Sequence, residues 1–257
     1  NWNTPQTVTV TGVNDGSVVD GNQTSTVTVS IDDNNSNNSF DPLADQTVSV
    51  TTTDNDVPGF TVAESSGSTS VNESGTTDTF TVVLNAQPTS DVLLSLAASD
   101  ATEASVTSSL TFTPANWDTA QTATVTGLDE STVDGNQTST ITISIVDAVS
   151  NDSFDPVADQ TVSVSTVDND TAGFTVVQTS GSTSVSESGN SDTFTIVLNA
   201  QPISDVVLTV TSSDTGEATV NSPLTFTAAN WNSAQTVTVT GVDDNIIDGT
   251  ITSTITI

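Results

Sequence analysis

Apolar and polar residues alternate with a period of two along almost the whole chain. Val or Ile alternates with Thr or Ser in QTVTVTG (Gln6–Gly12), TSTVTVSI (Thr24–Ile31) and QTVSVTT (Gln46–Thr52). Successive side chains of a strand point to opposite faces, and β-branched residues favour strands. Each run therefore predicts a strand with one buried and one solvated face. No segment has the 3.6-residue period that indicates a helix.

Seven such runs are predicted between residues 57 and 170, with turn sequences such as NAQPT and PANWD between them. They span Gly59–Val62, Thr79–Leu84, Asp91–Leu96, Ser109–Thr113, Gln121–Gly127, Thr138–Ile145 and Gln160–Ser165. Seven short strands in about 115 residues are typical of an immunoglobulin-like β-sandwich.

The stretch Asn116–Ser144 has near copies that begin at Asn1 and Asn230, so a unit of about 115 residues repeats along the chain. We expect residues 1–56 to be the C-terminal part of one repeat, 57–170 a complete repeat and 171–257 the N-terminal part of the next. The predicted fold class is all-β, in tandem immunoglobulin-like seven-stranded β-sandwiches, and we expect the chain to be a segment of a longer array. The very short connections between repeats predict a stiff rod.

Phenylalanine is expected to supply bulk in each core. The predicted core positions are Phe60, Phe80, Phe112 and Phe154 in the complete repeat, and Phe174, Phe194 and Phe226 in the next. Trp117, with Trp2 and Trp231 at matching positions, is interpreted as a buried anchor; the alternative is an exposed ring that stacks on a sugar.

The charge of the chain is one-sided: 32 Asp and Glu and no Lys, Arg or His. Nucleic acids and anionic membranes are excluded as partners, because both are bound through basic groups. We expect neighbouring repeats of the same chain, and other copies of the protein, as partners instead. No apolar run approaches the roughly 18 residues of a membrane span, so no membrane insertion is predicted. The chain has no Cys, which excludes disulfides.

The order of the predicted strands gathers acidic residues at one end of the sandwich, here called the acidic pole. If each strand crosses the sandwich once, alternate connections lie at the same end. The acidic pole is then predicted to contain Glu73, Asp100, Glu103, Asp129, Glu130, Asp134, Asp168 and Asp170. Without basic partners such a cluster favours a bound cation, and oxygen ligands suit Ca²⁺.

The opposite pole is predicted to carry the loop VDAVSNDSFDPVAD, with Asp147, Asp152, Asp155 and Asp159. Two interpretations remain open: this loop lends a ligand to the acidic pole of the preceding repeat, or it is simply solvated.

The chain resembles a Calx-β repeat over essentially its whole length. The resemblance depends on Val-x-Glu-Ser-Gly (Val71–Gly75 and Val185–Gly189), on LTFTPANW (Leu110–Trp117), on QTVTVTG before an acidic loop, and on a closing Asp-Asn-Asp. It implies an immunoglobulin-like sandwich that binds Ca²⁺ at the acidic pole. The implied ligands are Glu73, Asp129, Glu130, Asp134, Asp168 and Asp170 in the complete repeat; Glu187, Asp243, Asp244 and Asp248 in the third; and Asp15, Asp20, Asp54 and Asp56 in the first.

The sequence departs from the family pattern in two places. The usual Asp-Gly-Thr-Ala step is SDATEASV (Ser99–Val106) or SDTGEATV (Ser213–Val220), where Asp100 and Asp214 are further candidate ligands. In the first copy Asn14 replaces an acid. Fewer carboxylates predict weak sites, with Kd of about 10⁻⁴–10⁻³ M as in extracellular modules.

We therefore expect a calcium-rigidified spacer array of a large bacterial adhesin or surface filament, extracellular and structural. The alternative is a filament subunit whose sandwich is completed by strand exchange between chains. A carbohydrate- or ice-binding module is a weaker alternative, suggested by the Thr-x-Thr rows. An enzyme is not expected, because His, Cys, Lys, Arg and Tyr are all absent.

Overall fold

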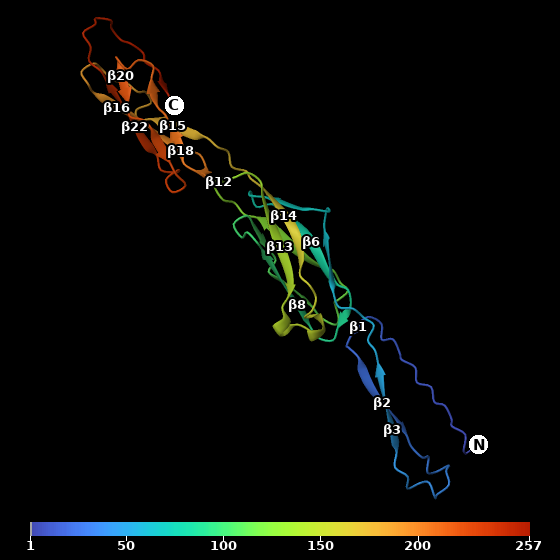
Figure 1. Cartoon of the computed structure of the whole chain (residues 1–257). Helices are drawn as coiled ribbons and strands as arrows, with labels where there is room; N and C mark the ends of the chain where they lie inside the picture. Colours follow the sequence, from blue (N-terminus) through green and yellow to red (C-terminus); the bar gives the residue numbers. More distant parts are fainter. Residues whose placement is uncertain (1) are drawn as a thin grey trace.

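The computed structural model describes residues 2–257 and is an all-β molecule drawn out into a rod (Figure 1). Residues 2–56 lie at one end, residues 171–257 at the other, and the largest sandwich lies between them. The helical elements of the described residues are two 3-10 turns, η1 (Asp147–Val149) and η2 (Asp152–Phe154). No helix in the described part of the chain is long and apolar enough to cross a membrane.

The middle segment is a sandwich of two sheets. One sheet has the order β10 (Ser109–Phe112), β8 (Val92–Ala98), β13 (Gln137–Ile145), β14 (Gln160–Val167) and β5 (Thr69–Asn72). The other has the order β4 (Phe60–Glu64), β6 (Thr77–Leu84), β11 (Gln121–Gly127) and β9 (Ala104–Val106). All neighbours are antiparallel except β14 and β5, which are parallel. The predicted all-β sandwich is confirmed.

Two edge strands of this sandwich, β5 and β9, were not predicted. β5 continues the chain from β4 after a turn at Gly67 and crosses to the opposite sheet. β9 and β10 form one bent run, whose first part pairs with β11 and whose second part pairs with β8. Both are too short for an alternating pattern to show, so their pairing is decided by tertiary contacts.

The core of the middle sandwich follows the predicted alternation. Phe80, Phe112 and Phe154 are fully buried, and Phe60 is nearly so. Trp117 is partly buried against this core, which agrees with the interpretation as an anchor.

The third segment, residues 171–257, has one complete sheet and one fragmentary sheet. The complete sheet has the order β15 (Phe174–Gln178), β16 (Ser191–Leu198), β22 (Gln235–Gly241) and β20 (Ala218–Val220). The facing layer consists of the pairs β18 (Val206–Leu208) with β21 (Leu224–Phe226), and β19 (Thr211–Ser212) with β23 (Ile255–Thr256).

The incomplete facing layer changes the burial of one predicted core residue. Phe194 and Phe226 are buried and Trp231 packs against them, but Phe174 is 41% exposed and its predicted core position is wrong. In the middle repeat β14 and the loop at residues 146–159 close the sandwich, and nothing among the described residues 171–257 takes their place.

The first segment contains one hairpin, β2 (Gln23–Val29) with β3 (Gln46–Thr52). The strand predicted at Gln6–Gly12 is not formed. Its counterpart β11 is stabilised by pairing with β6 and β9, and no strand of the described residues 2–56 takes their place. For the same reason Trp2 is 94% exposed, so the buried-anchor interpretation is wrong for this copy.

Candidate metal centre

Glu73 is the central residue of the acidic pole. It follows β5 in a tight turn that Gly75 completes with a φ of 83°. Its side chain is only 1% exposed. One carboxylate oxygen, Oε2, accepts a hydrogen bond from the backbone N–H of Asn169 at 3.0 Å, whereas Oε1 has no hydrogen-bond partner. A buried carboxylate with an unsatisfied oxygen is costly unless something positive meets it.

Two groups of three carboxylates converge on Glu73. Glu130 and Asp134, from the loop between β11 and β13, form one group with it, and Asp168 and Asp170, which follow β14, form the other. In each group the ligand oxygens lie within 4.8 Å of one another. Two oxygens that bind the same Ca²⁺ at about 2.4 Å can be at most about 4.8 Å apart, so both groups have the spacing of a calcium site.

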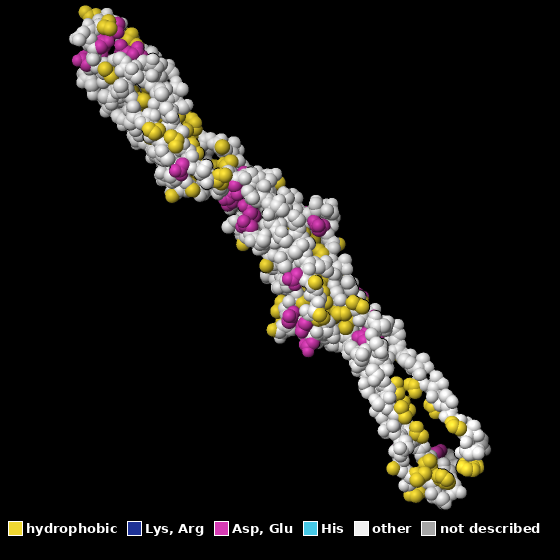
Figure 2. Space-filling view, in the orientation of Figure 1, with side chains coloured by type: hydrophobic (Ala, Val, Ile, Leu, Met, Phe, Trp, Pro, Cys, Tyr) yellow, Lys and Arg dark blue, Asp and Glu magenta, His cyan; other side chains and the backbone are white. Residues whose placement is uncertain are grey.

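Other oxygens of the cluster share the unsatisfied state of Glu73. Buried oxygens without a hydrogen-bond partner occur in Glu130 (Oε1), Asp134 (Oδ1) and Asp170 (Oδ2). The chain has no Lys, Arg or His that could neutralise them. Figure 2 shows Asp and Glu side chains gathered near the junction of the middle and third segments and at the far tip of the third. The residues therefore fit a divalent cation both in donor type and in charge.

The electrostatics of the acidic pole favour protonation in the absence of a cation. Burial raises the pKa of Glu73 above its ordinary value, and the charges of Asp168 and Glu130 add to the rise. Burial likewise raises the pKa of Asp170, with Asp168 as the next contributor. A cation would reverse this balance, because it favours the charged form of each carboxylate.

Asp168 organises the backbone around the cluster. Its Oδ2 accepts from the N–H of Gly135 at 2.8 Å, and its Oδ1 accepts from the N–H of Asp170 at 2.7 Å. The backbone N–H of Asp168 in turn donates to the side chain of Asn136 at 3.2 Å. The closing Asp-Asn-Asp triplet is thereby tied to the acidic loop.

The first segment repeats this arrangement around Asp54. Its Oδ2 accepts from the N–H of Gly21 at 2.8 Å, and its Oδ1 accepts from the N–H of Asp56 at 2.8 Å. These backbone hydrogen bonds, that of Asp56 first, lower the pKa of Asp54. The pKa of Asp56 is raised by desolvation and then by the charges of Asp54, Asp15 and Asp20.

Asp78 holds β5, the strand that precedes Glu73, in place. Its Oδ2 accepts from the N–H of Ser70 in β5 at 2.9 Å, and its Oδ1 accepts from the hydroxyl of Ser65 at 2.9 Å. These bonds lower the pKa of Asp78, with that of Ser70 making the largest contribution. Asp192 makes the same contact with Ser184 in the third segment, at 2.9 Å.

The structure brings together only part of the predicted ligand set. In the middle repeat Glu73, Glu130, Asp134, Asp168 and Asp170 meet. Asp129 is exposed and only receives a long contact from the side-chain amide of Asn169, at 3.5 Å. Asp100 instead caps its own turn, accepting from the N–H and hydroxyl of Thr102 at 2.9 and 2.6 Å.

The other two segments are less complete. Asp244 and Asp248 meet Glu217, whereas Glu187, Asp214 and Asp243 belong to no group of three among the described residues. In the described part of the first segment, Asp15, Asp20, Asp54 and Asp56 form no such group either. The same is true of the loop at the opposite pole, with Asp147, Asp152, Asp155 and Asp159.

The ligand set predicted from the sequence does not include Glu217. It does not include the counterpart Glu103 either, although Glu103 is predicted to lie at the acidic pole. Glu103 is only 5% exposed and its Oε2 has no hydrogen-bond partner. Burial, followed by the charges of Asp134 and Glu73, raises the pKa of Glu103. The sequence signal was present, because a Glu precedes Ala at the same register in TEAS and GEAT.

No protein-family model and no curated protein sequence matches the chain. Among solved structures, the chain is similar to CBD12 from CALX1.2, at 15% identity and a TM-score of 0.32 over 72% of this chain and 76% of that chain. It is also similar to the apo-form Calx CBD1 domain, at 16% identity and a TM-score of 0.32 over 43% of this chain and 98% of that chain. A third similar structure is surface layer protein SbsC, domains 4–9, at 20% identity and a TM-score of 0.30 over 79% of this chain and 30% of that chain. Likenesses of this size assign neither a family nor a ligand.

Proposed function

We propose that the chain is a series of calcium-stabilised β-sandwich repeats that act as stiff spacers in a large extracellular bacterial protein, an adhesin or a surface filament. The repeats are assigned to residues 1–56, 57–170 and 171–257. The observation that carries the proposal is Glu73, a buried carboxylate with one unsatisfied oxygen that groups with two further pairs of carboxylates.

Calcium would supply the positive charge that the chain itself lacks. Glu73 with Glu130 and Asp134, and Glu73 with Asp168 and Asp170, would hold it through oxygen ligands. Because these side chains come from three separate connections, a cation binds them together only in the folded state. Binding to the folded state alone stabilises the fold by mass action.

The loop that supplies two of these carboxylates also forms the joint to the next repeat. Between Glu130 and Asp134, β12 (Thr132–Val133) pairs in parallel with β17 (Gln201–Pro202) of the third segment. The N–H of Gln201 donates to the carbonyl of Ser131 at 2.6 Å. A cation that fixes this loop therefore also fixes the position of the following repeat.

The junction of the first and middle segments has the same geometry. β1 (Val18–Val19) pairs in parallel with β7 (Gln87–Pro88), and the N–H of Gln87 donates to the carbonyl of Ser17 at 2.6 Å. Val19 is 4% exposed and joins the hydrophobic core of the middle repeat. Two junctions built alike support a regular, stiff array.

Calorimetry of the whole chain tests the proposal. We expect about 10 mM Ca²⁺ to raise the melting temperature relative to the same protein in EGTA. For Kd values of about 10⁻⁴–10⁻³ M, that concentration is about 10 to 100 times Kd, and one site contributes about 1.4–2.7 kcal/mol to the free energy of unfolding. Isothermal titration should give Kd values of about 10⁻⁴–10⁻³ M, in keeping with few ligands per site.

Magnesium is the control, because it prefers a smaller octahedral shell and keeps much of its water. Mg²⁺ at the same concentration and ionic strength should raise the melting temperature much less than Ca²⁺. An equal melting temperature in Ca²⁺ and EGTA would refute the proposal.

A further inference from the structure

The inward-facing side chains of the middle repeat change from apolar to polar near the acidic pole. On β13 the inward residues are Ile143, Ile141 and then Ser139, and on β14 two buried valines are followed by Thr166. Ser139 and Thr166 are each 1% exposed, and neither hydroxyl oxygen has a hydrogen-bond partner. Because burial of an unpaired hydroxyl is unfavourable, these two side chains indicate a polar ligand inside this end of the sandwich.

The pairing of β14 with β5 places Thr166 beside Glu73. Thr166 pairs with Val71, and Glu73 is the next inward residue of the chain after Val71. The N–H of Glu73 donates to the carbonyl of Val167 at 3.3 Å, so the ladder continues to Glu73. Thr166 therefore lies on the same face as Glu73, one row nearer the middle of the sandwich. The unpaired atoms are Oγ1 of Thr166 and Oε1 of Glu73.

Ser139 lies at the same end of the core, next to the end of β8. Ile141 pairs with Ala98, the last residue of β8, and Ser139 is the next inward residue beyond this pair. From Ala98 the chain turns through residues 99–103 to β9. Glu103 in this turn is buried, and its Oε2 has no hydrogen-bond partner.

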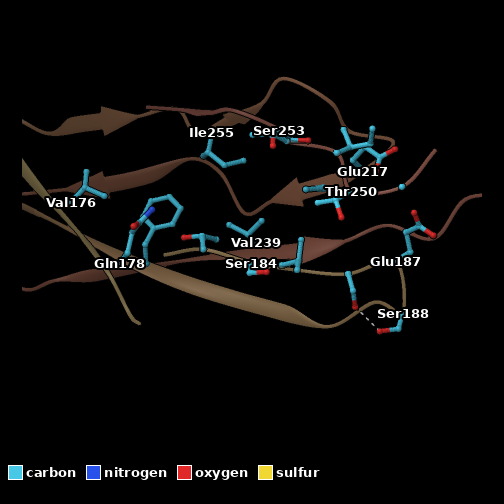
Figure 3. Close-up of a pocket in the computed structure, with 18 of the residues that line it drawn as sticks. Val176, Gln178, Ser184, Glu187, Ser188, Glu217, Val239, Thr250, Ser253 and Ile255 are labelled. Carbon is cyan, nitrogen blue, oxygen red and sulfur yellow. Dashed lines mark hydrogen bonds between the residues drawn. The ribbon is translucent and has the colours of Figure 1, made fainter. Parts of the chain in front are cut away.

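The third segment shows that the serine and the two glutamates face the same space. Ser253, Glu187 and Glu217 occupy the positions of Ser139, Glu73 and Glu103 in the sequence repeat, and all three line one cavity. In Figure 3, Ser253 lies between Ile255 and Glu217. The Oγ atom of Ser253 also has no hydrogen-bond partner.

The carboxylates alone do not fill the ligand shells of two calcium ions. An ion at each of the two groups that share Glu73 would take about six to eight oxygens, or about 12–16 for both. The five carboxylates concerned have only two oxygens each. Water is a common further ligand of Ca²⁺, and a buried water typically joins about three polar groups that would otherwise be unpaired.

We propose that the hydroxyls of Thr166 and Ser139 bind buried water beside Glu73 and Glu103, and that this water supplies oxygen ligands to the bound Ca²⁺. A carboxylate only accepts hydrogen bonds, whereas water and a hydroxyl both donate and accept, so water can join the two kinds of group. The ligand role of the water rests on the proposed calcium binding. The binding of water by the hydroxyls does not.

Thr166→Val tests the water in the absence of a cation, because valine has nearly the shape of threonine without the hydroxyl. If the hydroxyl holds water beside Glu73, its loss should lower the melting temperature in EGTA. If the hydroxyl is dry, valine should raise the melting temperature, and that result would overturn the proposal. Thr161→Val is the matched control, since it makes the same change on the exposed face of β14 and should have little effect.

Calcium titration calorimetry of the whole chain tests the ligand role. Loss of a side chain that holds a metal ligand in place typically weakens metal binding about 10- to 100-fold, and Thr166→Val should weaken Ca²⁺ binding by a factor of this size. Thr166→Ser keeps the hydroxyl and should bind Ca²⁺ nearly as the unmodified chain does. Equal Ca²⁺ affinities of Thr166→Val and Thr161→Val would overturn the proposal.

Europium luminescence counts the metal-bound water directly. Eu³⁺ substitutes for Ca²⁺, and each bound water shortens the emission lifetime in H₂O relative to D₂O. The excitation line of the middle repeat is the one that Glu73→Gln removes. At this line Thr166→Val and Ser139→Ala should have fewer bound waters than the unmodified chain, and Thr166→Ser the same number. An equal number in all four proteins would overturn the proposal.

Failure of the proposed function is recognised separately. It would appear as an absence of Ca²⁺ binding by the unmodified chain in the titration. The direction in which Thr166→Val changes the melting temperature in EGTA would still decide whether the hydroxyls hold water. Circular dichroism checks that each variant keeps the β-sandwich.

Discussion

At the scale of single residues, the unfavourable electrostatics of the middle repeat are centred on the carboxylate of Glu73. It is buried, and it has one hydrogen bond for two carboxylate oxygens. Nearby carboxylates repel it, and no basic side chain exists in the chain to offset them. A residue in this position weakens the cation-free fold and favours the cation-bound one.

Glu73→Gln should therefore change stability in opposite directions with and without calcium. In EGTA the variant should be more stable than the unmodified chain by about 1–3 kcal/mol, because a buried charge has been removed and one oxygen remains to accept from Asn169. In Ca²⁺ most of the stabilisation of the middle repeat should be lost. Thermal unfolding with and without calcium measures both effects.

The exposed Asp118 supplies the control, since Asp118→Asn removes the same charge outside the acidic pole. It should leave both melting temperatures nearly unchanged. If Glu73→Gln lowered stability in EGTA, the cost assigned to the buried charge would be wrong.

The effect of Glu73→Gln on stability in EGTA should depend on pH, in a direction that the raised pKa of Glu73 sets. The pKa of Glu73 is raised above its ordinary value of 4.5 in the folded chain, so the folded state binds its proton more tightly than the unfolded state. In EGTA the unmodified chain should gain stability as the pH falls through that raised pKa. The advantage of Glu73→Gln should be largest at neutral pH and vanish below pH 4.5, where Glu73 is protonated in the folded and the unfolded state alike. An advantage that does not depend on pH would contradict this origin.

At the scale of elements, the site depends on close contact between β11 and the turn after β5. Gly127 ends β11, and a Cβ added there would overlap the carbonyl of Asn72, the residue before Glu73. Gly241 meets the carbonyl of Ser186 in the same way in the third segment. Only glycine lets the strand approach so closely, so these glycines set the position of the acidic pole.

Gly127→Ala should both destabilise the middle repeat and weaken calcium binding. The overlap involves backbone that is held in a ladder, so a loss of about 1–3 kcal/mol or more is expected. Displacement of Asn72 should carry Glu73 away from its partner carboxylates. Chemical denaturation and calcium titration measure the two effects.

Gly59→Ala is the matched control, because its Cβ would meet only the side-chain amide of Asn85, at 2.9 Å. That amide can move, so a smaller loss of stability and an unchanged calcium affinity are expected. Equal effects of the two substitutions on calcium affinity would show that the Gly127 contact does not position the site.

At the scale of the whole molecule, the rod depends on two short parallel pairings between segments, β1 with β7 and β12 with β17 (Figure 1). Val19 is buried at the first of these joints. The third segment has Ile246 and Ile247 at the corresponding positions, and both are largely exposed. The first and third acidic loops thus present an apolar pair, the middle one presents Thr132 and Val133, and the first two of the three loops pair with the Gln-Pro strand of the following segment.

Gln201→Pro should loosen the joint between the middle and third segments. Proline has no N–H, so the bond to the carbonyl of Ser131 is lost. Spin labels at Thr111→Cys and Thr225→Cys report the distance across the joint. We expect a narrow distance distribution in Ca²⁺ for the unmodified joint, and broad ones in EGTA or with Gln201→Pro.

Gln201→Ala keeps the N–H and loses only the side-chain contact to the carbonyl of Ala228. It should therefore behave like the unmodified joint. A distribution equally narrow with and without Ca²⁺ would mean that the cation does not stiffen the rod.

The sequence alone determined the fold class, the seven principal strands and the side of the sandwich where acids gather. Period-two alternation sets which face of a strand is buried, and the parity of strand crossings sets which loops share an end. Both are properties of the order of residues along the chain, so the meeting of Glu73 with Glu130, Asp134, Asp168 and Asp170 could be anticipated from it.

Only the tertiary structure decided the rest. Gln6–Gly12 has the same alternating pattern as β11 but forms no strand, because a strand needs pairing partners that its own sequence does not supply. Asp100 accepts hydrogen bonds within its own loop, whereas Glu217 joins a cluster of carboxylates. Hydrogen bonds and burial, not residue type, decide which acidic residues meet. The joints and the unsatisfied oxygen of Glu73 arise from contacts between distant segments, which no local pattern encodes.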